Sequence, residues 1–142
     1  MGIREELERV RRIRLAAGEC RWRAELSMDL AARGMGPRQA LRLGGTEHNA
    51  PVAEYAPVYG YWRDRAGELS RRADRLFEDR ARPALHALTP GARRCVELYF
   101  NRACDWDEIS DRTGLTEAAC RRACAGALRE LERFGGPGRA GG

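Results

Sequence analysis

The sequence contains no lysine: all 26 basic residues among its 142 are arginine. Because alanine and glycine are also abundant, we attribute this bias to a GC-rich coding sequence rather than to guanidinium chemistry. No segment approaches the roughly 18 uninterrupted apolar residues of a membrane-spanning helix. Charged residues follow Met1-Gly2-Ile3 directly, without an apolar signal segment. We therefore expect no membrane span, no signal peptide and a cytoplasmic location.

The features of common enzyme sites are also missing. The two histidines, His48 and His86, lie far apart in the sequence and outside any metal or nucleophile motif. No glycine-rich loop of the phosphate-binding kind is present. Acid pairs such as Asp107-Glu108 stand at expected helix starts, where solvated carboxylates are usual. We predict that the protein is not an enzyme and holds no cofactor.

Five cysteines invite comparison with zinc sites, because thiolates bind zinc. Four of them lie in the last third of the chain: Cys95, Cys104, Cys120 and Cys124. Eight, fifteen and three residues separate them, without the close pairs of common zinc sites. We predict small buried hydrophobic side chains, no metal and, in a cytoplasmic protein, no disulfides.

The composition, with 43% hydrophobic and 33% charged residues, is typical of a helical protein. Residues 3–33 repeat apolar side chains at three- and four-residue steps, which predicts one long helix that stops at Gly34. The repeating residues are Ile3, Leu7, Val10, Ile13, Ala17, Cys20, Ala24, Met28 and Ala31. A second apolar line widens this stripe and predicts packing against more than one helix. It consists of Leu15, Trp22, Leu26 and Leu30.

A second long helical pattern follows a glycine-rich connector, residues 34–51, in which we expect one helical turn near residues 38–43. It is predicted to start at Asn49, or to bend or start later at Pro57, and to break at Pro83. Its apolar side consists of Val58, Trp62, Leu69, Ala73, Leu76 and Phe77, with Leu85 and Leu88 after the break. We predict an antiparallel hairpin, because each long helix must bury its stripe against the other or against a second copy.

Residues 88–134 carry the signals of three shorter helices. Thr89 is a good N-cap, and Pro90 suits the first helical position, so a helix should run from there to about Asn101. Its broad apolar side consists of Cys95, Val96, Leu98, Tyr99 and Phe100. This pattern predicts an amphipathic helix that covers part of a core.

A second helix and a turn follow. Asp105 and Glu108 have the spacing of a capping box, and Gly114 suits the left-handed conformation that ends a helix. Leu115 is expected to plug the turn, and Thr116 to cap a third helix. The residues of the second helix that face the core are Trp106 and Ile109.

The third helix, which should run to about Phe134, has two distinct sides at 100° per residue. One side, expected in the core, consists of Cys120, Cys124, Ala127, Leu128 and Leu131. The opposite side consists of Ala118, Arg121, Arg122, Ala125 and Arg129. Small residues allow close approach to base edges in a DNA groove, and arginine forks fit guanine O6 and N7. Taken alone, the arginines favour an ordinary solvated helix surface, because arginines are common there; the preceding cap, turn and helix spacing shift the balance toward a DNA-reading surface.

Three stretches of this segment match one known sequence pattern at its own spacing, with no gap needed: Asp105 to Ser110, Gly114 to Thr116, and Gly126 to Leu128 with Leu131. Together they resemble the fourth conserved region of bacterial sigma factors. Joined to a long helical N-terminal half, they are most similar to small phage-encoded transcription regulators of the ArpU and RinA type. The resemblance implies a sigma-like helix-turn-helix that binds double-stranded DNA and regulates phage or prophage genes.

The sequence departs from that family at two places. Gly126 stands where the family usually has an arginine, and Ala118 and Ala119 stand where it usually has polar residues. Both departures remove potential DNA contacts. Gly126 also weakens the helix by roughly 1 kcal/mol relative to alanine. We therefore expect lower affinity or specificity than in relatives that match the pattern better.

The predicted DNA-binding residues are Thr116, Glu117, Ala118, Arg121, Arg122, Ala125 and Arg129. Among them, Arg121 and Arg122 are the candidates for base contacts, and Glu117 can accept from cytosine N4. Thr116 and Arg129 are better suited to phosphate. The competing hypothesis is a helical protein-interaction or adaptor module, for example one that docks on RNA polymerase, in which the helix-turn-helix is structural. Its binding surfaces would include Trp22, Leu26, Tyr59 and Trp62.

The predicted fold is all-α and has three parts: a helical hairpin for oligomerisation or partner binding (1–87), a DNA-binding unit (88–134) and a disordered tail (135–142). The net charge of +5 favours an acidic partner. From Thr89 onward, however, nine arginines face eight acids, so we expect weak DNA binding by the isolated unit. We hypothesise a homodimer, because the apolar stripes are wider than one hairpin can cover and two-fold pairing would present two DNA-reading helices.

Overall fold

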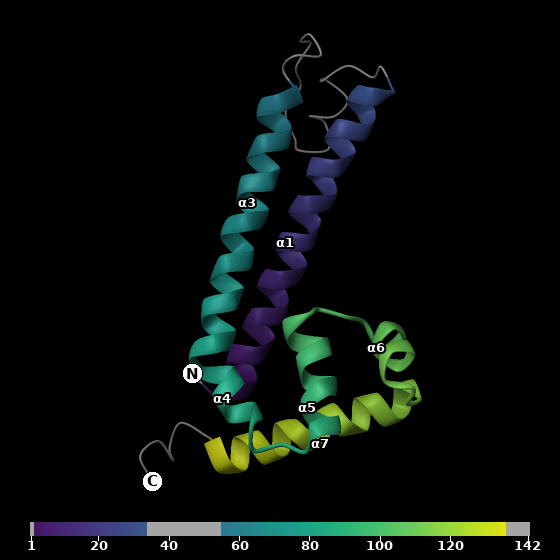
Figure 1. Cartoon of the computed structure of the whole chain (residues 1–142). Helices are drawn as coiled ribbons and strands as arrows, with labels where there is room; N and C mark the ends of the chain where they lie inside the picture. The colour runs from purple at the N-terminus through teal and green to yellow at the C-terminus, as the bar shows by residue number, and fades with distance from the viewer. Residues whose placement is uncertain (1, 34–54, 136–142) are drawn as a thin grey trace. The chain divides into compact units, whose positions relative to one another are not determined.

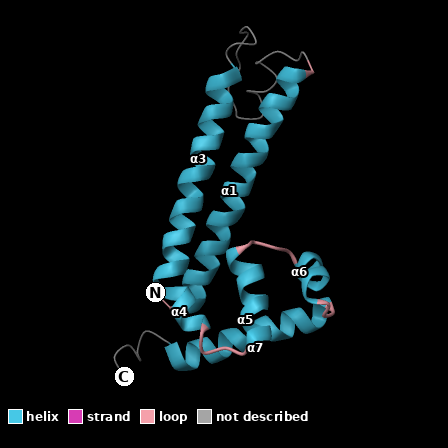
Figure 2. Cartoon of the chain, viewed as in Figure 1, coloured by secondary structure: helices cyan, strands magenta, loops and turns pink. Residues whose placement is uncertain are grey.

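The computed structural model describes residues 2–33 and 55–135, and within these ranges every regular element is helical (Figure 1, Figure 2). The elements are α1 (Ile3–Ala32), α3 (Tyr55–Leu76), the π-helical turn η2 (Phe77–Ala81), α4 (Arg82–Leu85), α5 (Pro90–Val96), the π-helical turn η3 (Glu97–Asn101), α6 (Trp106–Thr113) and α7 (Glu117–Gly135). The all-α prediction, with its long N-terminal helix, is confirmed. None of the described helices is long and apolar enough to cross a membrane.

Some predictions fall outside the described residues. These are the connector at 34–51 with its helical turn at 38–43, His48, and residues 136–142 of the tail. Gly135 is the last residue of α7. The start of α3 at Tyr55 places Pro57 in the first turn, where a helix tolerates the missing N–H.

Helix α1 confirms the predicted stripe from Ile3 to Ala24, whose members are all buried. Near the end of the helix the prediction is wrong: Met28 is 47% exposed, and Ser27, which belongs to neither predicted line, is buried. The buried row advances about 3.5 residues at a time, which keeps it on one side of the helix and brings Ser27 into line after Ala24. The Ser27 hydroxyl donates to the carbonyl of Arg23 at 2.9 Å, so its burial leaves no unpaired group.

The chain divides into two compact units. One consists of Met1–Arg14 and Arg71–Gly142, and the other of Leu15–Ser70. Helices α1 and α3 contribute to both units. The two units are defined by packing and not by function. The predicted functional division into residues 1–87 and 88–134 stays a prediction.

Within the Leu15–Ser70 unit, α1 and α3 form a helix pair. Arg21 Nη1 donates to Ser70 Oγ at 3.2 Å, and the Arg23 guanidinium lies 4.8 Å from the centre of the Trp62 ring. The buried side chains of this pair include Ala17, Cys20, Ala24, Ala66 and Leu69.

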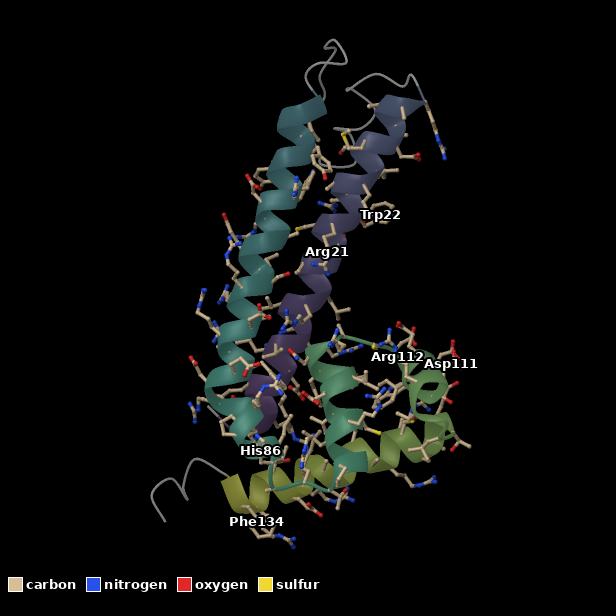
Figure 3. The ribbon with its side chains drawn as sticks, in the orientation of Figure 1. Arg21, Trp22, His86, Asp111, Arg112 and Phe134 are labelled. Carbon is tan, nitrogen blue, oxygen red and sulfur yellow. The ribbon has the colours of Figure 1, made fainter. Side chains whose placement is uncertain are left out.

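The second apolar line on α1 is only partly covered. Leu26 packs against the buried Leu30, whereas Leu15 is 49% and Trp22 55% exposed. Trp22 projects from α1 on the side away from α3 (Figure 3). Leu15 and Trp22 are seven residues apart, so they share a helix side opposite the buried row. A single partner helix cannot cover both sides.

The predicted break at Pro83 is wrong, because the helical run that begins at Tyr55 continues through Pro83 to Leu85. In the preceding π-helical turn, the Arg82 N–H bonds to the carbonyl of Phe77, five residues back. Such a widened turn is a common local adjustment in helices and helps to accommodate the proline ring. The chain turns at 86–88 instead, where three N–H groups bond to carbonyls three residues back at 3.0–3.3 Å.

The other unit connects the beginning of α1 with the C-terminal helices. Arg11 Nη1 donates to the carbonyls of Tyr99 (2.6 Å) and Cys104 (3.0 Å), and its guanidinium lies 3.8 Å from the centre of the Tyr99 ring. Arg80 Nη1 lies 2.9 Å from the buried carboxylate of Glu6. These contacts join residues far apart in the sequence, so the sequence pattern does not predict them.

Candidate nucleic-acid interface

Helix α5 begins as predicted and continues through a π-helical turn. Thr89 Oγ1 accepts from the N–H of Ala92 at 3.4 Å, and Pro90 is the first helical residue. The turn η3 extends the run to Asn101. Ala103 then adopts a left-handed conformation with φ of 55°, which ends the helical run before α6 begins.

The predicted caps of α6 and α7 are confirmed. Asp105 Oδ1 accepts from the Glu108 N–H at 2.8 Å, and the Glu108 carboxylate accepts from the Asp105 N–H at 3.2 Å. Gly114 ends α6 with φ of 77°. Thr116 Oγ1 accepts from the N–H of Ala119 at 3.1 Å, at the start of α7. Local hydrogen bonds therefore fix both ends of α6 and the start of α7, which together form a helix-turn-helix.

Leu115 does not plug the turn, because its side chain is 44% exposed. Two hydroxyl groups hold the turn instead. Ser110 Oγ donates to the Leu115 carbonyl at 2.6 Å, and Thr113 Oγ1 accepts from the Leu115 N–H at 3.3 Å. These bonds satisfy the backbone of the turn without a buried side chain at this position.

The apolar residues of α6 lie as predicted, to different degrees. Ile109 is completely buried, and Trp106 is half-buried. The Trp106 ring stacks on Tyr99, with centroids 4.3 Å apart and an interplanar angle of 15°. This pair joins α6 to η3.

The two sides of α7 are confirmed. The predicted core side, Cys120, Cys124, Ala127, Leu128 and Leu131, is buried throughout. On the opposite side, Ala118, Arg121, Arg122, Ala125 and Arg129 are all exposed, as are Thr116 and Glu117 at its start. The structure thus places all seven predicted site residues at the surface of α7 and its N-cap.

All five cysteines are buried and free, as expected for small hydrophobic side chains. Burial raises the pKa of Cys124 to about 12, and the neighbouring thiols of Cys95 and Cys120 add to the shift. Burial also raises the pKa of Cys95 and of Cys104 above the ordinary value. These thiols are therefore neutral and poorly nucleophilic near neutral pH. The described residues contain no cluster of three or more histidine, cysteine or acidic side chains placed to hold a metal.

The exposed arginines of α7 differ in their surroundings. Arg121 lies 3.8 Å from the Glu117 carboxylate and 5.8 Å from the centre of the Trp106 ring. Arg122 and Arg129 form no ion pair with any described residue. A Cβ added at Gly126 would lie 3.7 Å from Arg129 Nη2, so the Arg129 side chain extends beside this glycine.

The sequence pattern did not predict a second group of arginines that lie close together. Four arginines line one cleft of about 200 Å³. They are Arg82 of α4, Arg94 of α5, Arg102 at the end of η3 and Arg112 of α6. Arg112 projects from α6 (Figure 3). Successive members lie twelve, eight and ten positions apart along the chain, and only Arg94 and Arg102, on the continuous run formed by α5 and η3, share a local helical pattern. Only the packing of these helices brings them together.

Comparison with known proteins adds no assignment: no family model, no curated protein and no solved structure matches the chain. The resemblance to the fourth region of sigma factors therefore stays a prediction.

Proposed function

We propose that the protein is a sequence-specific DNA-binding transcription regulator, of phage or prophage genes, in which α7 is the recognition helix. One observation carries this proposal: three exposed arginines and two exposed alanines share one side of a helix whose opposite side is buried. The fold can thus hold this helix rigidly while its outer side enters the major groove. The association with phage genes rests on the sequence resemblance.

The surroundings of each arginine support distinct roles. Arg122 is free to direct two guanidinium N–H donors at the O6 and N7 atoms of a guanine edge. Arg121 first has to leave Glu117, but an exposed pair of this kind contributes only about 0.3–0.5 kcal/mol, so DNA can replace it. Glu117 would then be free to accept from cytosine N4, and Arg129, farther along α7, to contact phosphate.

The test is a fluorescence-anisotropy titration of the full chain with DNA from upstream of its own operon, beside a scrambled duplex of equal length and composition. The proposal expects saturable binding that is tighter on the upstream DNA, with affinity falling steeply as salt rises. Absence of binding to either duplex at low salt would contradict it.

The second candidate function is a protein-interaction or adaptor module, and it has its own observation. In the Leu15–Ser70 unit, four large apolar residues are between 47% and 62% exposed: Leu15, Trp22, Met28 and Tyr61. Exposed apolar surface of this kind favours a protein partner. RNA polymerase is the partner proposed for this function. We expect the full chain to pull down purified RNA polymerase, and we expect the Trp22→Ser variant not to do so.

For the proposed DNA-binding function, the partner that we favour for these exposed apolar residues is a second copy of the chain. Two-fold pairing would cover the apolar residues and present two copies of α7 to DNA. Light scattering at high micromolar concentration should give the mass of a dimer, and Trp22→Ser should shift it toward the monomer. Arg63→Ala, a control in the same unit that retains Trp22, should remain dimeric. A monomeric wild-type chain would exclude the homodimer.

A further inference from the structure

Four arginines line one cleft in the part of the chain that the structure describes. It measures about 200 Å³, and its lining residues are Arg82, Arg94, Glu97, Leu98, Asn101, Arg102 and Arg112. The buried Leu98 contributes the apolar part of the wall. No lining residue belongs to α7, so the cleft does not coincide with the exposed arginines of the proposed recognition helix.

The cleft holds more positive charge than the protein neutralises. Arg82 is already paired: its Nε lies 2.7 Å from the Glu78 carboxylate, and its Nη1 lies 3.2 Å from Glu97. These two carboxylates raise the pKa of Arg82, so its charge is fixed. The same Glu97 is the only acidic residue in the lining.

The other three arginines have no such partners. Arg94, Arg102 and Arg112 make no ion pair with any described residue, and all three are exposed to solvent. Like charges held around one small space repel each other, and an anion in that space would turn the repulsion into attraction. Asn101 Oδ1 accepts from Arg14 Nη2 at 2.8 Å, which leaves the amide N–H groups of Asn101 as further donors.

We propose that this cleft is a phosphate-binding site, in which Arg94, Arg102 and Arg112 hold the oxygens of a phosphate or diphosphate group. Guanidinium groups match phosphate oxygens with paired N–H donors, which suits this ligand better than a carboxylate held by one fork. The volume lies below the roughly 300–1,000 Å³ of pockets that enclose drug-sized molecules, so the cleft fits one or two phosphate groups rather than a whole nucleotide. The phosphate can come from a free phosphate compound or from the backbone of DNA.

The first arm of the test titrates inorganic pyrophosphate into the full-length chain by calorimetry, at constant ionic strength maintained with sodium chloride. We expect saturable binding at one site. Arg112→Gln and Arg94→Gln should each weaken it about tenfold to a hundredfold, the loss that corresponds to one charged hydrogen-bonding group. Arg129→Gln on α7 is the matched control and should bind pyrophosphate like the wild type. Circular dichroism of each variant establishes that the helices are intact.

The second arm asks where the phosphate comes from. If a free phosphate compound fills the cleft, Arg112→Gln should bind DNA as the wild type does. If the DNA backbone fills it, Arg112→Gln should bind DNA more weakly, and pyrophosphate should compete with DNA. Either result supports a phosphate site. The site is excluded if pyrophosphate does not bind, or if Arg129→Gln weakens pyrophosphate binding as much as Arg112→Gln does. Because pyrophosphate binding requires no DNA, failure of the DNA-binding proposal would not be mistaken for failure of this one.

Discussion

The three-helix segment from α5 to α7 and the Leu15–Ser70 unit bury apolar side chains to different extents. In the segment, Cys95, Val96, Ile109 and Cys120 are completely buried, and the large apolar residues left exposed stand at a turn and at the end of α7. In the other unit, exposed apolar side chains such as Leu15 and Trp22 stand in the middle of a long helix. The first region buries its large apolar side chains and exposes arginines, whereas the second leaves large apolar side chains exposed.

The largest expected effect tests this contrast with two aliphatic truncations. Ile109→Ala should lower the free energy of unfolding by about 2–5 kcal/mol, because it opens a cavity in a closed core. Leu15→Ala should change it by less than about 0.5 kcal/mol, since that side chain is half-exposed. Urea denaturation followed by circular dichroism measures both. Equal losses would mean that the Leu15 side chain is as well covered as Ile109 and that the contrast is false.

The next effect sharpens the contrast in charge. Arg121→Ala or Arg122→Ala should weaken specific DNA binding by about 1–3 kcal/mol and relax the preference at one base pair, if the arginine contacts guanine. A phosphate contact would instead weaken binding on all sequences and make the slope of log affinity against log salt shallower by about one unit.

The control for these arginines is Arg65→Ala in the other unit, an exposed residue paired with Glu68 at 3.2 Å. It should leave DNA affinity unchanged. If neither α7 substitution alters affinity on any duplex while helicity is preserved, the proposed recognition surface is wrong.

Three glycines extend the comparison to the backbone. Gly114→Ala should destabilise the protein by about 1–2 kcal/mol, because a side chain is strained at its φ of 77°. Gly126→Ala in α7 and Gly60→Ala in α3 should each stabilise it by about 0.5–1 kcal/mol, because neither added Cβ would clash and both positions lie within a helix. Thermal unfolding at one concentration ranks the variants. A stabilising Gly114→Ala would overturn this account of the turn.

The smallest effect concerns the buried thiols of the three-helix segment. Burial raises the pKa of Cys124 from 9.0 to about 12, so the folded state retains the thiol proton that the unfolded state loses. This contribution to stability is fully present below about pH 9 and is lost as pH rises from there toward 12. Between pH 9 and 10 the loss should be about 1 kcal/mol. Chemical denaturation at several pH values should show a shallower decline for Cys124→Ala, and an unchanged decline would contradict the assignment.

Local signals allowed the sequence to predict the helices and the candidate recognition surface. Caps at Thr89, Asp105 and Thr116 and the glycine at 114 act through neighbouring residues, so their effects follow from sequence spacing. The two sides of α7 follow from 100° per residue in the same way.

Tertiary structure decided what spacing could not. The exposure of Trp22 depends on how many helices surround α1. The helical run through Pro83 depends on the π-helical turn η2, whose residues Phe77 and Ala81 are buried. The arginine cleft depends on α4, the run formed by α5 and η3, and α6 meeting in space. The helical pattern of a sequence specifies which residues share one side of a helix. Which residues pack against that side depends on the whole chain, because burial and charge repulsion act between residues distant in sequence.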